Sequence, residues 1–495
     1  MKKKLFSSFI NKFWSFSSNI IFVPIYISLL GLEEFAIISF GILLSALLSV
    51  LDAGLTATLS KMFSSNEVKG LSKYKIFKSL EACYFIIILL VFVVVISISN
   101  QIAFNWLKLE NLNPETISLC IKIIGLEFGF RLISNFYIGG FIGLENQVKA
   151  NIYQIIYNIL RNGIVIIPIL IDPNLIWFFS WQFFCTIFYS IFLRYKLYYF
   201  ITKSKKYFYS KIQISKTVLN HIWKFTGGMA LISFVSAINS QLDKVLLSKT
   251  LSIETFGYYS LAFTLSTIIV LFVSPVSITI LPRLTFLFSS NKLVEAESLF
   301  LSTYLLVSIC VFIFGSLVFL IPEELVFIWT GDDILAYEVS GFLNIVVIGS
   351  VFLALQILPF NIAIANGYTK LNNILGLSSL FISVPLYLLV PNIYGPKSFA
   401  FIYSAIQLTI GLIFIIIINK KYIKIPTLKF LTIYVISPFL ISFFSAKFFI
   451  NMFSLSNSRV QNIFTIIIIS LLMFILNYLL LIKLRKVKLS ILKSF

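Results

Sequence analysis

The stretch from Glu127 to Gly163 places charged side chains inside two long apolar runs. Glu127 and Arg131 lie in the middle of the first run, and Arg161 lies in the middle of the second. Each run is long enough to cross a membrane, where a charged side chain costs roughly 2.5–3.5 kcal/mol at bilayer depth. Because this cost is high, charges at such positions indicate a functional role.

Spacing on the first run allows a structural and a functional interpretation. Glu127, Arg131 and Asn135 follow one another at intervals of four residues, so they share one helix face. Glu127 and Arg131 could simply neutralise each other. Lys122, nearer the outer end of the run, and Arg161 have no acidic residue at helical spacing. A cavity lined by such cations attracts phosphate, diphosphate or acidic sugars.

Three further charges lie within predicted spans. Asp52 either pairs locally or binds a coupling cation. Asp243 and Lys244 are adjacent in the sequence, so they cannot both face the same way. The predicted site therefore combines four cations for the substrate with three carboxylates for ion coupling or charge pairing: Arg131, Arg161, Lys122 and Lys244, with Asp52, Glu127 and Asp243.

Uncharged polar residues also form stripes on helix faces. One stripe lies in the first span and another in the seventh: Asn11, Ser15, Ser18 and Asn19, and Ser233, Ser236 and Ser240. These stripes indicate either hydrogen bonds between packed helices or a hydrated inward surface. We also predict that residues 139–146 form a short polar turn between two spans, and that Glu81 is solvated at a membrane edge.

The composition is that of an all-α polytopic membrane protein. Of the 495 residues, 59% are hydrophobic and 12% are charged, whereas soluble domains have roughly 25% charged residues. We predict about fourteen spans: 11–31, 35–60, 79–100, 116–141, 150–171, 175–198, 225–248, 256–281, 298–321, 340–366, 371–391, 398–418, 428–449 and 461–482.

The distribution of Lys and Arg sets the predicted orientation. With the N-terminus inside, 30 of the 39 Lys and Arg residues fall in inner segments and 5 in outer ones. This bias predicts cytoplasmic N- and C-termini. It also accounts for most of the net charge of +20, so we predict no nucleic-acid partner. Attraction to anionic membrane lipids is a secondary effect.

The sequence carries a weak internal repeat. The segments 34–36 and 63–66 and the glycine Gly143 recur as 255–257, 288–291 and Gly367. The near-constant offset predicts two six-helix lobes. The predicted limits are 1–202 for the first lobe, 203–224 for a basic cytoplasmic linker, 225–425 for the second lobe and 426–495 for an extra helix pair with a basic tail.

Motifs for catalysis are absent from the sequence. It contains no P-loop, no H-E-x-x-H and no G-x-S-x-G, and no loop is long enough for a nucleotide-binding or glycosyltransferase domain. The four cysteines lie far apart within apolar runs, without a C-x-x-C motif. We therefore predict a protein that is not an enzyme and that needs no cofactor or metal.

Several short motifs resemble those of the bacterial polysaccharide flippases. They are distributed along the whole chain, at residues 51–55, 139–151, 241–244, 254–259, 367–370 and 394–395. The pattern is similar to the O-antigen and capsule repeat-unit flippases, the Wzx type, of the MOP exporter superfamily. That superfamily also contains the MATE drug exporters and the lipid II flippases.

The resemblance implies a bacterial inner-membrane protein with two six-helix lobes around a cationic cavity. Its substrate would be an undecaprenyl-diphosphate-linked oligosaccharide, moved by alternating access and coupled to Na+ or H+. A polysaccharide polymerase and a chain-length regulator would be partners. Fourteen spans depart from the twelve of two lobes, so the role of the last pair stays unassigned.

The sequence leaves two alternative functions beside that of a flippase. A MATE-like exporter of cationic drugs would require an acidic cavity, whereas the predicted spans hold four cations and three carboxylates. A membrane polymerase or ligase would be expected to carry a large outer loop, and the longest outer loop here is the short segment 322–339.

Overall fold

The computed structural model describes residues 2–52, 54–64, 70–202, 237–368, 370–453 and 458–483. These residues are almost entirely helical, and they include no strand beyond an isolated bridge between Lys108 and Ser252. The predicted linker 203–224 lies outside the described residues, as do Ser233 and Ser236 of the seventh predicted span.

The prediction of an all-α polytopic membrane protein is confirmed. Within the described residues, twelve helical stretches are long and apolar enough to cross a membrane. The helix α5, Pro114–Gly143, is not among them, although its 30 residues are sufficient in length. It contains Lys122, Glu127 and Arg131, which lower its apolar character. The count of fourteen spans and the side of each terminus stay predictions.

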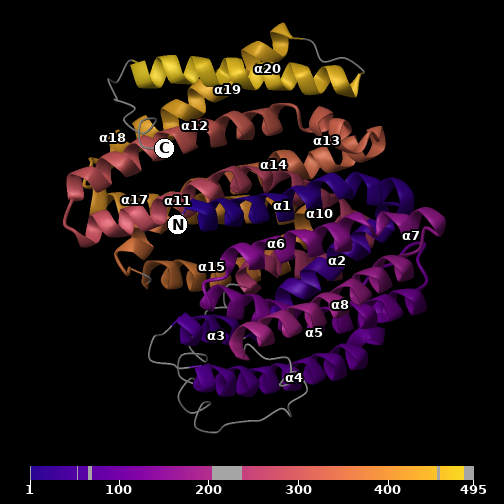
Figure 1. The fold of residues 1–495 in the computed structure, drawn as a ribbon. Helices are drawn as coiled ribbons and strands as arrows, with labels where there is room; N and C mark the ends of the chain where they lie inside the picture. The colour runs from indigo at the N-terminus through magenta and orange to yellow at the C-terminus, as the bar shows by residue number, and fades with distance from the viewer. Residues whose placement is uncertain are drawn as a thin grey trace. The chain divides into compact units, whose positions relative to one another are not determined.

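The chain divides into two compact units, and the first comprises Met1–Gly257. In this unit α5 packs against α3, α4 and α8, and α1 packs against α6 (Figure 1). Its elements are α1 (Lys2–Leu30), α2 (Leu32–Leu48), η1 (Ser49–Asp52), α3 (Leu55–Ser64), α4 (Gly70–Gln101), η2 (Ile102–Trp106), α5, α6 (Gln147–Asn158), η3 (Ile159–Gly163), α7 (Ile166–Ile171), α8 (Leu175–Thr202) and a helix over residues 237–250.

The second unit comprises Tyr258–Phe495. Here α14 packs against α11, α12 and α17, and α19 packs against α12 and α20 (Figure 1). Its elements are α10 (Ile253–Ser266), which begins in the first unit, α11 (Ile268–Ser289), α12 (Leu293–Leu320), α13 (Pro322–Thr330), α14 (Asp333–Ala365), α15 (Lys370–Leu389), α16 (Pro391–Tyr394), α17 (Lys397–Ile418), η4 (Asn419–Ile423), α18 (Thr427–Leu431), η5 (Thr432–Ile436), α19 (Ser437–Met452), α20 (Arg459–Asn477) and η6 (Tyr478–Lys483).

The end of α5 corrects one prediction from the sequence. Residues 139–146 were expected to form a turn, but the helix continues to Gly143, and the turn is limited to the residues that follow. The backbone N–H of Asn146 donates to the carbonyl of Phe141 at 2.9 Å, and Glu145 has a φ of 60°. The same turn ends α14, where Gly367 has a φ of 67°. The residue of this turn that matches Gly367 is Glu145, whereas the predicted repeat pairs Gly367 with Gly143, so the repeat stays a prediction.

Gly139 and Gly143 lie within the helix because α3 crosses it closely. A Cβ at Gly139 would lie 3.0 Å from the carbonyl oxygen of Thr56, and a Cβ at Gly143 would lie 2.6 Å from that of Ser60. Glycines at an interval of four residues allow two helix backbones to approach in a membrane. Because these two residues lack a side chain, α3 and the adjoining η1 turn can lie directly against α5.

A single methyl group at this crossing is expected to be destabilising. We expect Gly143→Ala to lower the free energy of unfolding by about 1–3 kcal/mol, because the backbone of α3 must move. Gly163→Ala is the matched control, since its Cβ would meet a ring atom of Phe22 at 3.2 Å. Thermal unfolding in detergent measures both variants, and equal midpoints would contradict the close crossing.

Candidate functional site

A buried carboxylate on α5 lies between two arginines of the first unit. The Nε of Arg161 lies 3.1 Å from Oε1 of Glu127, and the Nη1 of Arg131 lies 3.9 Å from Oε2. The hydroxyl of Thr186 on α8 donates to Oε1 at 3.0 Å. Three of the predicted site residues are thus brought together, from α5 and η3.

Arg161 and Arg131 differ in how closely they pair with Glu127. Arg161 makes a hydrogen-bonded ion pair with Glu127, and its Nη1 also donates to Oδ1 of Asn162 at 2.9 Å. Arg131 is at the limit of ion-pair distance, and its side chain is 26% exposed, against 17% for Arg161. Since one carboxylate cannot neutralise two guanidinium groups, this cluster has an excess of one positive charge.

A π-helical turn positions Arg161. The segment η3 interrupts the helix that runs from α6 to α7, and π-turns often occur at functional sites. The hydroxyl of Tyr26 on α1 donates to the carbonyl of Asn162, and the indole of Trp181 on α8 donates to the carbonyl of Leu160 at 2.9 Å. These bonds satisfy carbonyls of the widened turn and fix its orientation.

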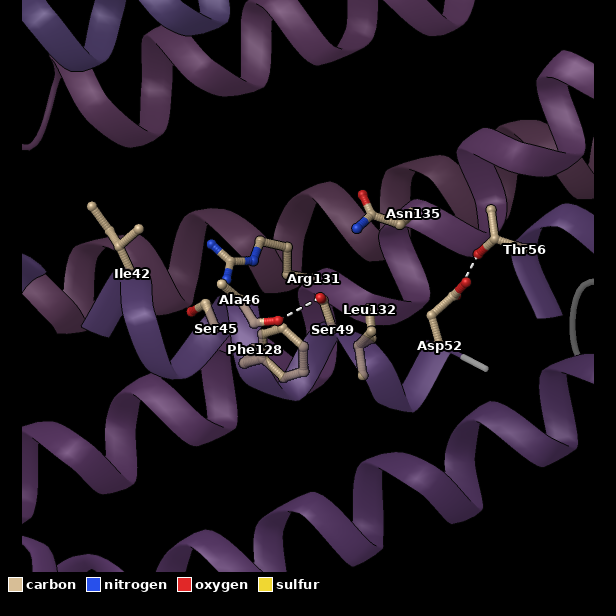
Figure 2. Close-up of a pocket in the computed structure, with 10 residues that line it drawn as sticks. All are labelled: Ile42, Ser45, Ala46, Ser49, Asp52, Thr56, Phe128, Arg131, Leu132 and Asn135. Carbon is tan, nitrogen blue, oxygen red and sulfur yellow. Dashed lines mark hydrogen bonds between the residues drawn. The ribbon is translucent and has the colours of Figure 1, made fainter. Parts of the chain in front are cut away.

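A polar cleft of about 520 Å³ lies between α2, η1 and α3 on one side and α5 on the other. Figure 2 shows the guanidinium of Arg131 near Ser45 and Ala46, with Asn135 further along α5. The lining residues are Ile42, Ser45, Ala46, Ser49, Asp52, Thr56, Phe128, Arg131, Leu132 and Asn135. Two predicted site residues, Arg131 and Asp52, therefore line the same cleft.

Asp52 is held by two hydroxyl groups. Thr56 donates to its Oδ1 at 2.6 Å, and the hydroxyl of Tyr84 on α4 donates to the same oxygen. The oxygens of Thr56 and Tyr84 are 2.8 Å apart. The carboxylate thus lies within a small hydrogen-bonded cluster at one end of the cleft, with hydroxyl groups as its partners.

The other predicted site residues lie elsewhere in the first unit. Lys122, Asp243 and Lys244 do not line this cleft. Lys122 is half-buried on α5, and it makes no ion pair with any residue that the structure describes. In the helix of residues 237–250, Asp243 is buried and Lys244 is half-buried.

The polar stripe of the first span bonds to a neighbouring helix. Asn11 donates to Gln154 at 2.6 Å and to Asn151 at 3.2 Å, and Asn158 donates to Ser15 at 2.7 Å. These bonds join α1 to α6 along their length. Of the two interpretations of this stripe, the structure supports hydrogen bonding between packed helices at Asn11 and Ser15.

The expectation that Glu81 is solvated was wrong. Its side chain is fully buried, and its oxygens lie 2.7 Å from Nε of Arg194 and 3.2 Å from Nζ of Lys78. The hydroxyl of Tyr137 donates to it at 2.9 Å. This cluster joins α4, α5 and α8. The acidic residue three positions after Lys78 was the only signal in the sequence, and Arg194 lies too far along the chain to be associated with it.

Apolar helices of membrane-spanning length, with a cleft lined by the charged Asp52 and Arg131, define a multi-pass membrane protein. The fold agrees with this class. The chain is similar to a solved structure of the lipid II flippase MurJ in an inward closed conformation, with a TM-score of 0.74, 16% identity, and coverage of 98% of this chain and 99% of that one.

Two further solved structures share the fold. An inward-facing multidrug resistance MATE transporter of the MOP superfamily matches with a TM-score of 0.68 and 10% identity, over 82% of this chain and 94% of that one. A MOP superfamily transporter from Pyrococcus furiosus, described as having a binding pocket of reverse polarity, matches with a TM-score of 0.57 and 11% identity, over 85% of this chain and 95% of that one. These identities establish the shared fold alone.

The family follows from the sequence match. The family described as polysaccharide biosynthesis protein matches residues 1–288, more than half of the chain, and the chain belongs to this family. No curated protein matches the sequence. The family match and the shared fold agree with the resemblance predicted from the sequence, and twelve helical stretches of the described residues make the chain a multi-pass membrane protein.

Proposed function

We propose that this protein moves an undecaprenyl-diphosphate-linked oligosaccharide from the inner to the outer leaflet of the cytoplasmic membrane by alternating access. It acts as a flippase for a repeat unit of O-antigen or capsule, and it has no catalytic role. Membership of the polysaccharide biosynthesis family and the fold shared with flippases and exporters support the proposal. The polymerase and chain-length regulator would act on the translocated unit.

One observation carries the assignment of the anion site. Arg131 lines the cleft, and its Nη1 lies 3.9 Å from Oε2 of Glu127, whereas Arg161 lies 3.1 Å from Oε1, so Arg131 is the more weakly paired of the two arginines. Its planar guanidinium can therefore form bidentate hydrogen bonds with a phosphate of the lipid diphosphate. Ser45, Ser49 and Asn135 supply further hydrogen-bonding groups along the cleft.

Glu127 and Arg161 act on this anion site indirectly. Glu127 is buried on α5, one turn before Arg131, and its bonds to Arg161 and Thr186 fix the carboxylate. The fixed carboxylate restrains Arg131 without neutralising it. Of the four cations predicted from the sequence, the proposal therefore assigns substrate contact to Arg131, while Arg161 holds the carboxylate.

Asp52 is the residue we propose for ion coupling. It lines the same cleft as Arg131, and its Oδ1 accepts from Thr56 and Tyr84. Protonation or cation binding there would change the charge of the cleft by one unit. The same carboxylate supports the rival function, since a MATE-like multidrug exporter requires an acid to bind cationic drugs.

Deletion of the gene in its host tests the function against this rival. We expect loss of surface polysaccharide and accumulation of lipid-linked repeat units on the inner side, because the transferred units no longer reach the outer leaflet. Complementation with the wild-type gene is the control. Intact surface polysaccharide together with a gain in drug sensitivity would refute the flippase and support the exporter.

A further inference from the structure

The last third of the chain carries positive charge without any carboxylate. Residues 339–495 contain no Asp or Glu. Within this region, four lysines lie in ten residues, where one span ends and the next begins: Lys420, Lys421, Lys424 and Lys429. We call these four residues the lysine turn.

All four side chains of the lysine turn are exposed. None of them makes an ion pair with a carboxylate among the residues described by the structure. Four like charges within ten residues repel one another, and the repulsion is relieved only by anions from outside this part of the chain. The positive potential of the four lysines therefore attracts a negatively charged ligand.

The turn has a fixed backbone conformation. The segment η4 is a π-helical end of α17, and the side-chain amide of Asn419 donates to the carbonyl of Ile425 at 2.8 Å across the turn. Lys424 adopts a left-handed φ of 60°. The aromatic ring of Phe430 on α18 is buried beside Tyr304 and Tyr434, with ring centroids at 5.5 Å and 5.0 Å.

An aromatic side chain orients one lysine of the turn. The Nζ of Lys421 lies 3.3 Å from the ring centroid of Tyr368 and 5.5 Å from that of Tyr422. Tyr368 is held by the turn after α14, where its backbone N–H donates to the carbonyl of Ala363 at 2.8 Å. The exposed Lys370 follows Tyr368 by two residues, so a fifth cation lies close in sequence to the tyrosine that contacts Lys421.

The position of the lysine turn identifies the kind of anion. It connects the candidate spans Lys397–Ile423 and Thr427–Met452, so it lies at a membrane boundary. Leu428, between the lysines, is 78% exposed, and an exposed leucine at this depth contacts acyl chains. Basic clusters beside a span bind anionic lipid headgroups, and a phospholipid supplies the phosphate and the acyl chains at the same place.

We propose that the lysine turn is a binding site for an anionic phospholipid headgroup. The ammonium groups contact the lipid phosphate, Tyr368 keeps Lys421 in position, and Leu428 packs against the acyl chains. This site is formed by residues of the second unit and the cleft of Arg131 by residues of the first, so the two sites share no residue. A structural lipid here would fix the α17–α18 junction.

Native mass spectrometry of the full chain in detergent tests the proposal. The chain is titrated with phosphatidylglycerol, with phosphatidylcholine and with inorganic pyrophosphate. We expect preferential binding of phosphatidylglycerol. Replacing all four lysines of the turn by glutamine is expected to weaken it at least tenfold. Tyr368→Leu is expected to weaken it less, since it frees Lys421 without removing a charge.

A charge-matched variant distinguishes a specific lipid site from the general electrostatic attraction of anionic lipid to a basic protein. It replaces Lys108, Lys249, Lys397 and Lys447 by glutamine, four exposed lysines outside the turn. We expect this variant to bind phosphatidylglycerol as the wild type does. Equal losses in both variants would overturn the proposal, as would equal binding of phosphatidylcholine. Pyrophosphate that displaces the lipid at equal concentration would show a soluble-anion site and would also overturn it.

Discussion

Replacing Arg131 with alanine is expected to reduce translocation of the lipid-linked oligosaccharide by about 10- to 150-fold. A hydrogen bond to a charged group contributes about 1.5–3 kcal/mol, and 1.4 kcal/mol corresponds to a factor of ten. The variant should still fold, because Arg131 is partly exposed and its ion pair with Glu127 is long. Transport of lipid-linked repeat units in proteoliposomes measures the effect.

Two matched variants make this result specific. Arg131→Lys keeps the charge but loses the bidentate geometry, so we expect partial activity. Lys122→Ala removes a cation from the same helix but outside the cleft, and we expect nearly normal transport. If Arg131→Ala transports as well as Lys122→Ala does, Arg131 does not bind the substrate.

Replacing Glu81 with glutamine is expected to destabilise the protein by about 3–5 kcal/mol, because it leaves buried cations without their carboxylate. The side chain of Lys78 is only 2% exposed, so it cannot regain water without a rearrangement of α4. Arg194 is 22% exposed and loses a bond of 2.7 Å. Thermal unfolding in detergent, followed by light scattering, measures the loss.

A double variant separates charge from packing in this cluster. Glu81→Gln combined with Lys78→Met removes one cation with the carboxylate, so we expect it to recover most of the lost stability. Lys75→Met, nearby on α4, is the control. A double variant as unstable as Glu81→Gln alone would show that the lost bond to Arg194 at 2.7 Å, rather than the burial of Lys78, accounts for the instability.

Much of the fold could be predicted from the sequence, because apolar runs of membrane length are a strong signal. The end of α5 could not be predicted. Gly139 and Gly143 suggest a turn by residue type, but α3 crosses α5 there and requires their small size. The need for a close helix approach is a tertiary property, and local propensity contains no information about it.

The candidate site was predictable only where its residues share a helix. The interval of four residues placed Glu127 beside Arg131, as the structure has it. Arg161 had no acidic neighbour in sequence, yet it forms the shorter pair with Glu127 from another helix. Glu81 and Arg194 are likewise far apart in the chain. Pairs between helices depend on packing, which the order of residues does not encode directly.

The unequal charge around Glu127 has a consequence for the transport cycle. With two guanidinium groups and one carboxylate, the cluster around Glu127 retains one positive charge when no substrate is bound. Occluding such a charge from water is costly, whereas a bound diphosphate would offset it. An empty carrier is therefore expected to resist occlusion and a loaded one to undergo it, which would suppress futile cycling and dissipation of the ion gradient.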